Sequence, residues 1–504
     1  MIYIDPPYNT GNDFVYEDDY ADPIGTYLDI TGQRDGEGKL STNTESAGRF
    51  HSNWLNMMYP RLKLARNLLR EDGVIFLSID SGEVSSLRQI CNEIFGEQNF
   101  VADVIWQKKY TQSNDVRRFS ENHDHILCFA RSARFYINPL PRSAKQLKTY
   151  RNRDNDPRGP WKATPLHAKS GSSTSEFTFP NGIRWQPPVG TYRRFSDQRM
   201  LEMFERGEIW FGEDQSLIPQ RKSFLSQVKE GVAPVTIWQY EEVGHNHEAN
   251  DELKGLGLGG VFNNPKPTRL LRRILQIATN EASLVLDFFA GSGTTAHAVM
   301  ALNAEDGGNR RCISVQLPEP TDEKSEACKA GYKTISEITR ERVRCAGKKI
   351  LEEKASTLDG RAESLDVGFR AYKLVDTNFT KWRADSSLDA DELSDLFTQM
   401  HESANDHARP EALLTEILLK LGFSLTEQVK GVDVAGLHVF NVMDGLVMAY
   451  LDEHTKPTLE QLRALVVLEP ERLVILEDAF QDDDELKTNL VQECRTHGVD
   501  LWTA

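Results

Sequence analysis

The feature that most constrains the fold of this chain is a short apolar run that ends in two adjacent prolines. Met1-Ile2-Tyr3-Ile4 has the composition of a buried strand, and Asp5-Pro6-Pro7-Tyr8 follows it directly. Each proline fixes φ and lacks a backbone N–H, so the chain can neither extend the strand ladder nor enter a helix interior here. The sequence therefore predicts a buried strand that leaves its sheet through a rigid corner rich in hydrogen-bond acceptors.

The chemistry of this corner suits a flat molecule that carries an amino group. The Asp5 carboxylate and the carbonyl of Pro6, which precedes the second proline, can each accept a hydrogen bond from an NH2 group. The Tyr8 ring offers a face on which a flat base can stack. Asp5, Pro6, Pro7 and Tyr8 are therefore the candidate catalytic residues.

Beyond this corner, helices and strands alternate in two parts of the chain. Apolar residues at helical spacing predict helices over residues 53–70, 82–95, 267–279, 293–303 and 327–354. Short apolar runs predict strands over residues 74–79, 100–106, 125–130, 283–288 and 311–317. Strands that alternate with helices imply a mostly parallel sheet, so the predicted fold class is α/β. Residues 12–50 show no sustained period, and we expect a long loop there.

A glycine-rich motif, Asp287-Phe288-Phe289-Ala290-Gly291-Ser292-Gly293-Thr294-Thr295, lies at the end of a predicted strand. A glycine-rich turn between a strand and a helix brings backbone N–H groups and the helix N-terminus close to a ligand. The spacing differs from dinucleotide-binding turns and P-loops, and no lysine follows to hold a γ-phosphate, which disfavours ATP. Phe-x-Gly-x-Gly after a strand is typical of S-adenosylmethionine sites, although the motif alone also fits a structural strand-turn-helix.

Charge is distributed unevenly along the chain. The 504 residues carry a formal net charge of −17, which by itself argues against a nucleic-acid partner. Residues 101–200, however, hold 18 Lys and Arg against 8 Asp and Glu, a net of +10, whereas residues 351–504 hold 14 against 31, a net of −17. The basic middle predicts a surface for a polyanion. The acidic C-terminal part fits either a module that faces a protein partner or a soluble acidic domain.

Composition excludes several other classes. No run approaches the roughly 18 apolar residues of a membrane-spanning helix, and the first residues lack the basic and apolar regions of an export signal. The six cysteines are scattered without a Cys-x-x-Cys pair, so neither disulfides nor structural zinc are expected, and a cytoplasmic location fits. The pairs His123/His125 and His245/His247 lack further ligands at fitting spacing, so we expect no metal.

Several stretches of this chain, including the proline corner and the glycine-rich motif, resemble the β-class amino DNA methyltransferases. The resemblance is narrower to the modification (Mod) subunits of type III restriction-modification systems. The resemblance rests on IYIDPPYNTGNDFVY (2–16), FHSNWLNMMYPRLKLA (50–65), DGVIFLSID (72–80), NNPKPTRLLRRIL (263–275), DFFAGSGTTAHAV (287–299) and DVGFRAYKL (366–374). It implies an S-adenosylmethionine-dependent methyltransferase with a Rossmann-like, mostly parallel sheet, an inserted target-recognition domain and a small C-terminal α/β domain. It also implies methylation of adenine N6 in double-stranded DNA, a homodimer and a restriction (Res) subunit as partner.

The resemblance also implies a role for each motif. Asp5 and the Pro6 carbonyl would accept the adenine N6 hydrogens, and Tyr8 would stack on the target base. Around the cofactor it places Asn264, Lys266, Pro267, Thr268, Asp287, Phe289, Ala290, Gly291, Ser292, Gly293 and Thr294, with Gln316 where many relatives have an acid for the ribose hydroxyls. Lys266 also fits a solvated lysine at a helix start. The cofactor supplies the reactive methyl group, so the protein needs no metal.

The region between the two motifs is the candidate target-recognition domain. It interleaves aromatic and basic residues among many prolines, a composition suited to binding DNA. The candidate DNA-contacting residues are Arg117, Arg118, Arg151, Arg153, Arg158, Arg184, Arg193 and Arg194. The sequence cannot separate an arginine that reads a base from one that holds a phosphate or supports the fold.

Five domains are predicted from these boundaries. Residues 1–130 form the catalytic half of the methyltransferase, 131–260 the target-recognition insertion, and 261–355 the cofactor-binding half. Residues 356–407 form a connector and 408–504 an acidic C-terminal α/β domain.

The start of the chain departs from the family pattern. Relatives carry a substantial region ahead of the catalytic corner, including a strand that ends in Gly-Asp and a helix, whereas here the catalytic strand begins at Met1. We expect this strand to lie in the sheet with at least one neighbour missing. A truncated or wrongly started frame and a short protein completed by another chain both fit.

The predicted function is adenine-N6 methyl transfer by a type III Mod subunit. One alternative is a catalytically defective remnant that only binds DNA or a partner. The other is a methyltransferase for protein glutamine amides, which usually has Asn in place of Asp5 and lacks a basic insertion.

Overall fold

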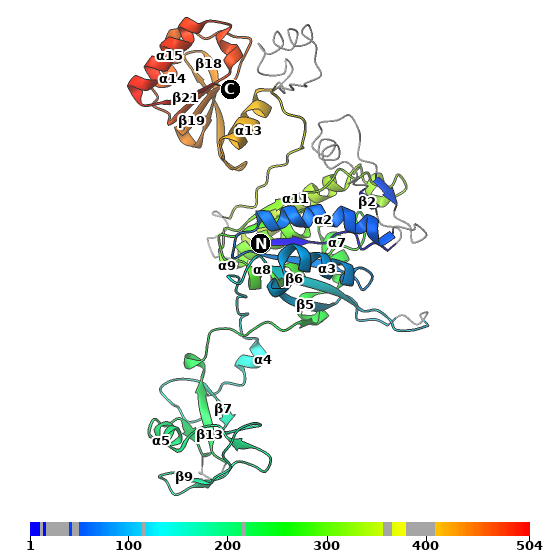
Figure 1. Cartoon of the computed structure of the whole chain (residues 1–504), viewed down its shortest axis with the longest axis vertical. Helices are drawn as coiled ribbons and strands as arrows, with labels where there is room; N and C mark the ends of the chain where they lie inside the picture. Colours follow the sequence, from blue (N-terminus) through cyan, green and yellow to red (C-terminus); the bar gives the residue numbers. More distant parts are fainter. Residues whose placement is uncertain are drawn as a thin grey trace. The chain divides into compact units, whose positions relative to one another are not determined.

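The computed structural model describes residues 1–10, 14–16, 40–42, 50–112, 117–213, 218–355, 365–379 and 409–503. Contacts divide the chain into two compact units, both drawn in Figure 1. The first unit comprises the described residues of Met1–Tyr16 and Leu40–Val367. The second comprises the described residues of Gly368–Ala504.

A seven-stranded sheet forms the centre of the first unit, in the order β14-β5-β6-β4-β1-β15-β16. Its strands are β1 (Ile2–Ile4), β4 (Val74–Ile79), β5 (Phe100–Gln107), β6 (His123–Ala130), β14 (Ile237–Trp238), β15 (Leu284–Asp287) and β16 (Arg311–Ser314). Neighbouring strands are parallel except at β6, which runs antiparallel to both β4 and β5. The predicted α/β fold with a mostly parallel sheet is confirmed.

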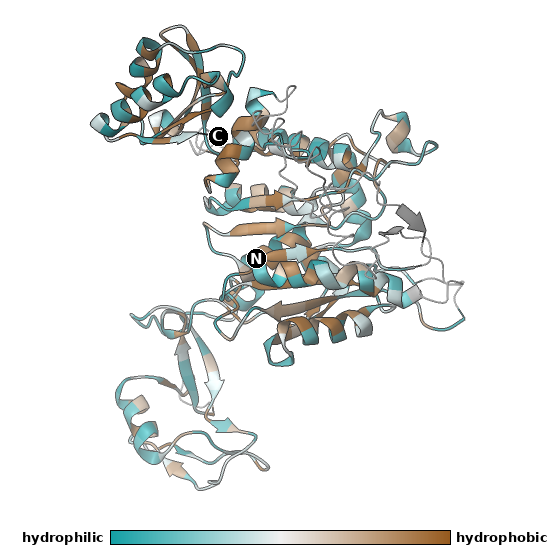
Figure 2. Ribbon diagram, turned by 45° about the horizontal axis from the view of Figure 1, so that its top comes forward, coloured by the Kyte–Doolittle hydropathy of each residue, from teal (hydrophilic) through white to brown (hydrophobic). Residues whose placement is uncertain are grey.

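Helices cover both faces of this sheet. Alternate residues of a strand point to opposite faces, and in β1 Ile2 and Ile4 join one apolar cluster whereas Tyr3 joins another. The first cluster includes α2 (Phe50–Leu68) and α3 (Val84–Phe95), and the second includes α8 (Thr268–Ala278) and α9 (Thr294–Asp306). Figure 2 shows hydrophobic colour concentrated on the central strands. The sheet is therefore the middle of three layers.

The position of β1 differs from the sequence-based expectation. Ile2 is paired with Ile75 of β4 on one side and with Leu286 of β15 on the other, so the expected missing neighbour of this strand is wrong. The reason lies in the topology of parallel sheets, where strands far apart in sequence become neighbours through crossover connections. Among the described residues, β16 and β14 form the two edges of the sheet.

Other boundaries differ in detail from the predicted elements. The charged helix expected over residues 327–354 consists of α10 (Glu326–Lys329) and α11 (Ile335–Ala355), and between them Gly331 takes a φ of 94° that a helix cannot accommodate. Two short strands, β2 (Phe14–Tyr16) and β3 (Leu40–Thr42), pair antiparallel within the region expected to be a loop. Nearly all other residues of that region lie outside the described ranges.

The basic insertion builds small sheets and apolar clusters of its own. It contains α4 (Ala144–Leu147), β7 (Trp161–Pro165), β8 (His167–Ala168), β9 (Phe177–Thr178), β10 (Arg184–Trp185), β11 (Tyr192–Arg193), α5 (Asp197–Glu205), β12 (Ile209–Trp210) and β13 (Gln220–Phe224). β12, β13 and β7 form one sheet, and β10-β9 and β11-β8 form two ribbons. Leu140 bridges Val232, after which β14 returns the chain to the large sheet, followed by α6 (Tyr240–Val243) and α7 (Asn246–Gly255).

The second unit is a smaller α/β module, as predicted. Its sheet has the order β17-β18-β19-β20-β21, antiparallel from β17 to β19 and parallel from β19 to β21. The elements are α13 (Pro410–Lys420), β17 (Val429–Val434), β18 (Leu437–Val442), β19 (Val447–Tyr450), α14 (Leu459–Val466), β20 (Arg472–Ile475), α15 (Asp484–His497) and β21 (Asp500–Thr503). None of the described helices in either unit is long and apolar enough to span a membrane.

Candidate active site

Two neighbouring strands bring the two sequence motifs to the same edge of the sheet. β1 and β15 are parallel and adjacent, with Ile2 opposite Leu286. The proline corner (residues 5–8) and the glycine-rich turn (residues 288–293) therefore both follow the carboxyl ends of their strands, where open α/β sheets bind ligands. Burial raises the pKa of Asp287, and the charge of Asp5 adds to this rise.

The proline corner is held by side chains from two helices. The Trp54 indole of α2 donates a hydrogen bond to the Pro7 carbonyl at 2.7 Å. Asn9, which has a φ of 60°, donates to Glu83 at 2.6 Å. Glu83 is fully buried at the start of α3, and His51 Nδ1 lies 2.5 Å from the same carboxylate oxygen. The Pro7 carbonyl is therefore already hydrogen-bonded to Trp54. The carbonyl that the sequence analysis assigns to the substrate is that of Pro6, the preceding residue.

Lys266 lies against the proline corner. Its ammonium nitrogen is 2.7 and 2.6 Å from the two carboxylate oxygens of Asp5. It also lies 5.0 Å from the centroid of the Tyr8 ring, within cation–π range. Lys266 is only 8% exposed, so the alternative of a solvated lysine at a helix start is wrong. Lys266, which the sequence predicts to lie near the cofactor, thus contacts the candidate catalytic acid.

Tyr8 faces a second ion pair. Its hydroxyl donates to Asp124 over a long distance of 3.5 Å, and the other oxygen of Asp124 is 2.5 Å from the Lys108 ammonium. Burial, followed by the charges of Asp5 and Asp124, raises the pKa of Tyr8 well above its ordinary value, so the phenol stays neutral. Asp124 lies at the start of β6, directly between the two histidines considered in the sequence.

The glycine-rich turn needs its glycines for conformation and for packing. Gly291 and Gly293 have φ values of 51° and 83°, which side-chain-bearing residues rarely adopt. A Cβ on Gly293 would lie 3.1 Å from the Thr339 methyl carbon of α11. The Thr339 hydroxyl donates to the Gly291 carbonyl at 2.5 Å. The turn therefore delivers the chain directly into the N-terminus of α9 while lying tightly against α11.

Asp287, at the end of β15, and Gln316, just after β16, make hydrogen bonds to this turn and to α9. The buried carboxyl of Asp287 accepts hydrogen bonds from the Thr295 hydroxyl at 2.6 Å and from the Phe289 N–H at 3.1 Å. Burial raises the pKa of Asp287 to about 7. Gln316 accepts a hydrogen bond from the Gly291 N–H at 2.7 Å, so its side-chain oxygen is engaged by the protein.

A buried arginine of α11 also makes hydrogen bonds to the turn. Arg342 of α11 is fully buried and donates to the hydroxyls of Ser292 and Thr294, both at 2.7 Å. Its guanidinium lies 3.6 Å from Glu252, and burial lowers the pKa of Arg342 to about 10. Glu252 in turn accepts from the hydroxyl of Thr268 at 2.6 Å, which links the turn to the start of α8. Arg342 lies outside the recognised motifs, so sequence analysis does not identify it.

The remaining residues expected around the cofactor border the same region. Asn264 is exposed with a φ of 51°, and Pro267 directly precedes α8. Ala290 is buried, and the Phe289 side chain is partly exposed beside Phe288. A Cβ on Gly291 would lie 3.2 Å from the Phe262 ring, so the segment ahead of Asn264 also touches the turn. A backbone turn, a helix N-terminus and neighbouring rings suit the amino-acid end and the flat base of S-adenosylmethionine.

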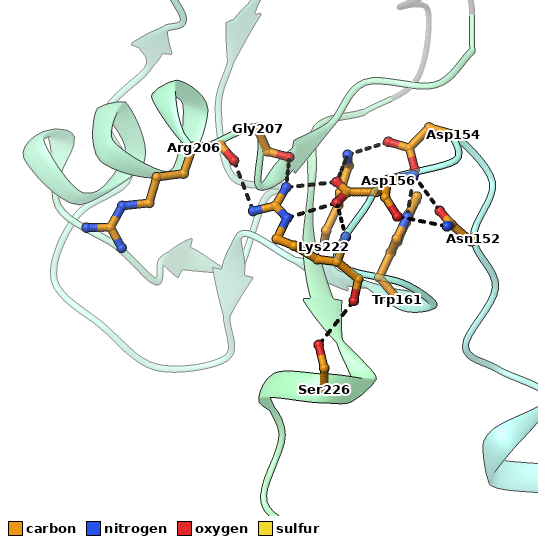
Figure 3. Close-up of polar contacts among 9 residues, drawn as sticks. Asn152, Asp154, Asp156, Trp161, Arg206, Gly207, Lys222 and Ser226 are labelled. Carbon is orange, nitrogen blue, oxygen red and sulfur yellow. Dashed lines mark hydrogen bonds and ion pairs between the residues drawn. The ribbon is translucent and has the colours of Figure 1, made fainter.

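The candidate DNA-contacting arginines fall into two groups. Arg158 donates to Asp156 at 2.8 Å and to the carbonyls of Arg206 and Gly207, in the network around Lys222 that Figure 3 shows. Arg193 pairs with Asp197 and its side chain is 5% exposed. These two stabilise the insertion. Arg117, Arg118, Arg151, Arg153, Arg184 and Arg194 are exposed.

The histidine pairs have structural roles. His125 lies in β6 with Nδ1 3.0 Å from Asp103, a hydrogen bond that raises the pKa of His125. His245 caps α7 by accepting a hydrogen bond from the Glu248 N–H. Across the part of the chain that the structure describes, no group of three or more His, Cys, Asp or Glu side chains could hold a metal ion.

The geometry defines an α/β domain with an acidic proline corner beside a glycine-rich turn, and comparisons with known proteins place it in a family. The family model of the N6/N4 methyltransferases, described as DNA methylase, matches residues 1–319, and the chain belongs to this family. The resemblance found in the sequence is thereby confirmed.

Curated relatives narrow the family further. The chain is 38% identical to the Mod subunit of the type III restriction-modification enzyme StyLTI from Salmonella typhimurium, over 74% of this chain and 56% of that protein. It is 30% identical to the EcoPI Mod subunit of Escherichia phage P1, over 86% and 70%, and 29% identical to the EcoP15I Mod subunit of Escherichia coli, over 97% and 79%. The chain thus spans little more than half the length of the first relative. These similarities support the narrower resemblance to the Mod subunits.

Proposed function

We propose that this chain transfers a methyl group from S-adenosylmethionine to the N6 atom of adenine in DNA, as the modification subunit of a type III system. The observation that carries this proposal is the parallel pairing of β1 with β15, which brings the proline corner and the glycine-rich turn to the same edge of the sheet. The relatives named as Mod subunits support the subunit assignment.

The proposed chemistry addresses the weak nucleophilicity of the adenine amino group, whose lone pair is delocalised into the ring. When bound, S-adenosylmethionine would supply an activated methyl group on a positively charged sulfur. Asp5 and the Pro6 carbonyl would accept the two N6 hydrogens and so favour a pyramidal nitrogen aimed at that methyl group. This role is one of positioning and electrostatic preorganisation, in a corner that Trp54 and Glu83 hold rigid.

The target adenine must leave the DNA helix to reach this corner. Unstacking and unpairing a base costs a few kcal/mol. Stacking on an aromatic side chain returns about 1–3 kcal/mol per base, and the half-buried Tyr8 ring is placed to provide it. The neutral Tyr8 phenol keeps the ring from repelling an approaching DNA phosphate.

The exposed arginines of the insertion are the proposed DNA contacts. Arg151, Arg153, Arg184 and Arg194 lie on its surface, and Arg117 and Arg118 lie in the connection between β5 and β6. Double-stranded DNA is the proposed partner, bound by a cytoplasmic homodimer that works with a Res subunit. Because Arg158 and Arg193 are committed to acidic partners within the insertion, we do not assign them to DNA.

A methylation assay tests this function. The purified chain is incubated with S-adenosylmethionine and DNA from a host without the gene, and the nucleosides are separated by mass spectrometry. N6-methyladenine is expected, and long-read sequencing of the product maps the site. Asp5→Ala should abolish the product while DNA binding persists. N4-methylcytosine alone, or methylated protein glutamine without methylated DNA, would contradict the proposal.

A further inference from the structure

The acceptor that the proposed reaction needs already has a partner. The Lys266 ammonium lies 2.7 and 2.6 Å from the Asp5 oxygens, 5.0 Å from the centroid of the Tyr8 ring and 6.0 Å from that of Trp106. The Asp5 side chain is 25% exposed and that of Lys266 9%. The ion pair is therefore a largely desolvated contact.

This position is the one that the target amino group has to take. An adenine that stacks on Tyr8 and donates from N6 to Asp5 places a nitrogen with two N–H groups at hydrogen-bond distance from the same carboxylate. An ammonium nitrogen has three N–H groups and makes the same kind of contact. Because Lys266 contacts both carboxylate oxygens of Asp5 and lies near the Tyr8 ring, an N6 amino group that stacks and donates there competes with the lysine for the same oxygens.

We propose that Lys266 holds the place of the target amino group in the ligand-free protein and leaves Asp5 when cofactor and target base bind. This inference rests on the proposed function. It makes Lys266 a residue that excludes water from the acceptor and screens the charge of Asp5 until a substrate replaces it.

Charge gives a reason for the lysine to leave. Asp5 in this partly buried position requires a nearby cation, because an uncompensated carboxylate is costly to desolvate. Lys266 provides that cation in the ligand-free protein. With a sulfonium cofactor in place, Lys266 would face a second positive charge, and Asp5 would no longer depend on the lysine for compensation. The flexible four-carbon stem of lysine allows the ammonium to withdraw.

The consequence is coupling between the two substrates. If the positive centre of the cofactor weakens the hold of Lys266 on Asp5, the base enters a vacated acceptor, and by linkage the base strengthens cofactor binding equally. The coupling should depend on the positive charge of the ligand and not only on its shape. A neutral cofactor analogue would therefore couple less than a cationic one.

The test measures flipping of the target adenine by the fluorescence of 2-aminopurine placed beside that adenine in the site mapped by sequencing, because 2-aminopurine itself lacks the 6-amino group that has to replace Lys266. Two ligands are compared in the intact chain: S-adenosylhomocysteine, a neutral thioether, and sinefungin, which carries an ammonium group in place of the sulfonium. We expect sinefungin to increase flipping at least about fivefold more than the thioether, the lower end of typical coupling. Equal effects of the two ligands would overturn the inference without any variant being needed.

Lys266→Met removes the charge but keeps most of the apolar stem. It should flip the target base readily without any ligand, and the difference between the two analogues should disappear. Lys266→Arg should retain the difference, and Lys254→Met, which changes an exposed lysine of α7, should behave as the wild type. If Lys266→Met instead weakens cofactor binding in calorimetry and leaves flipping unchanged, Lys266 is a cofactor ligand and the inference is wrong. Failure of the proposed function would show separately, as absence of N6-methyladenine with the unaltered chain.

Discussion

The proline corner and the glycine-rich turn lie on neighbouring strands, yet they are stabilised in opposite ways. At the corner, the groups assigned to substrate are held by charges that face the site: Lys266 on Asp5, and Lys108 on the partner of Tyr8. At the turn, the hydrogen bonds come from Thr339 and Arg342 of α11, two residues that are not assigned to a substrate. The corner can therefore change partners during a reaction, whereas the turn is fixed before any ligand arrives.

The largest expected effect tests the corner. Asp5→Asn keeps the shape of the side chain but removes the charge that holds Lys266 and one acceptor oxygen. We expect kcat to fall at least about 100-fold, the scale of losing one preorganised polar group in a transition state. Single-turnover methylation of the mapped site measures it. Asp80→Asn, at the end of the neighbouring strand β4, is the matched control and should retain activity within a few-fold.

An Asp5→Asn chain that methylates within about tenfold of the wild type would show that the corner works by shape alone. The charge of Asp5 would then not be needed for methyl transfer, and the corner would not differ from the turn in depending on charge. DNA binding by both variants should equal that of the wild type, because neither side chain belongs to the exposed arginine surface.

The next effect tests the turn. Arg342→Met leaves the buried hydroxyls of Ser292 and Thr294 without their donor, and hydrogen bonds to charged groups contribute about 1.5–3 kcal/mol each. We expect the first unit to lose about 3 kcal/mol of stability, seen as faster hydrogen exchange in the turn and the first turn of α9. Cofactor binding in calorimetry should weaken, and Arg342→Lys should restore part of it. The control is Arg344→Met, since Arg344 is an exposed residue on the same helix that pairs with Glu341.

A smaller effect concerns pH. Burial raises the pKa of Asp287 to about 7, so between the ordinary value of 3.8 and 7 the folded chain binds this proton more tightly than the unfolded chain. Stability from this group is therefore present at low pH and falls as pH rises, by about 2 kcal/mol between pH 5 and 7. Asp287→Asn should remove that dependence. Urea unfolding of both chains across this range measures it, and parallel curves would refute the assignment.

The smallest effect concerns the Tyr8 hydroxyl. Its contact with Asp124 is 3.5 Å long, too long for a strong hydrogen bond. Tyr8→Phe should therefore change kcat/KM by less than about fivefold, or 1 kcal/mol, whereas Tyr8→Ala removes the stacking face and should reduce base flipping strongly. A large loss in Tyr8→Phe would mean that the hydroxyl tightens on Asp124 when DNA binds.

The sequence predicted what is contiguous and missed what the fold assembles. The proline corner and the glycine-rich turn are each one uninterrupted stretch, so their residue types carried their chemistry openly. Glu83, Asp124 and Arg342 reach the site only because particular strands and helices become neighbours, and no local pattern signals that. Lys266 was recognised as a site residue, but its partner Asp5 lies 261 positions away.

Two of the arginines predicted to contact DNA have acidic partners close to them in the sequence. Asp156 lies two residues before Arg158, and Asp197 four residues after Arg193, so both could have been suspected of internal pairing. The strand order was likewise beyond reach: β14 has only two residues, and the neighbours of β1 come from β4 and β15.

The pairing of β1 with β15 also means that the two halves of the site are synthesised at different times. Asp5 leaves the ribosome before Lys266 and the strand beside it, which follow after more than 260 further residues. At about 5–20 residues per second, the proline corner waits roughly 13 to 50 seconds before its counter-charge exists. During that interval a nascent chain carries the acid and the stacking ring but has nowhere to hold a cofactor. Chains shortened so that they end inside the insertion are therefore expected to be inactive. Two fragments produced by cutting within the insertion should form the site only when they are mixed.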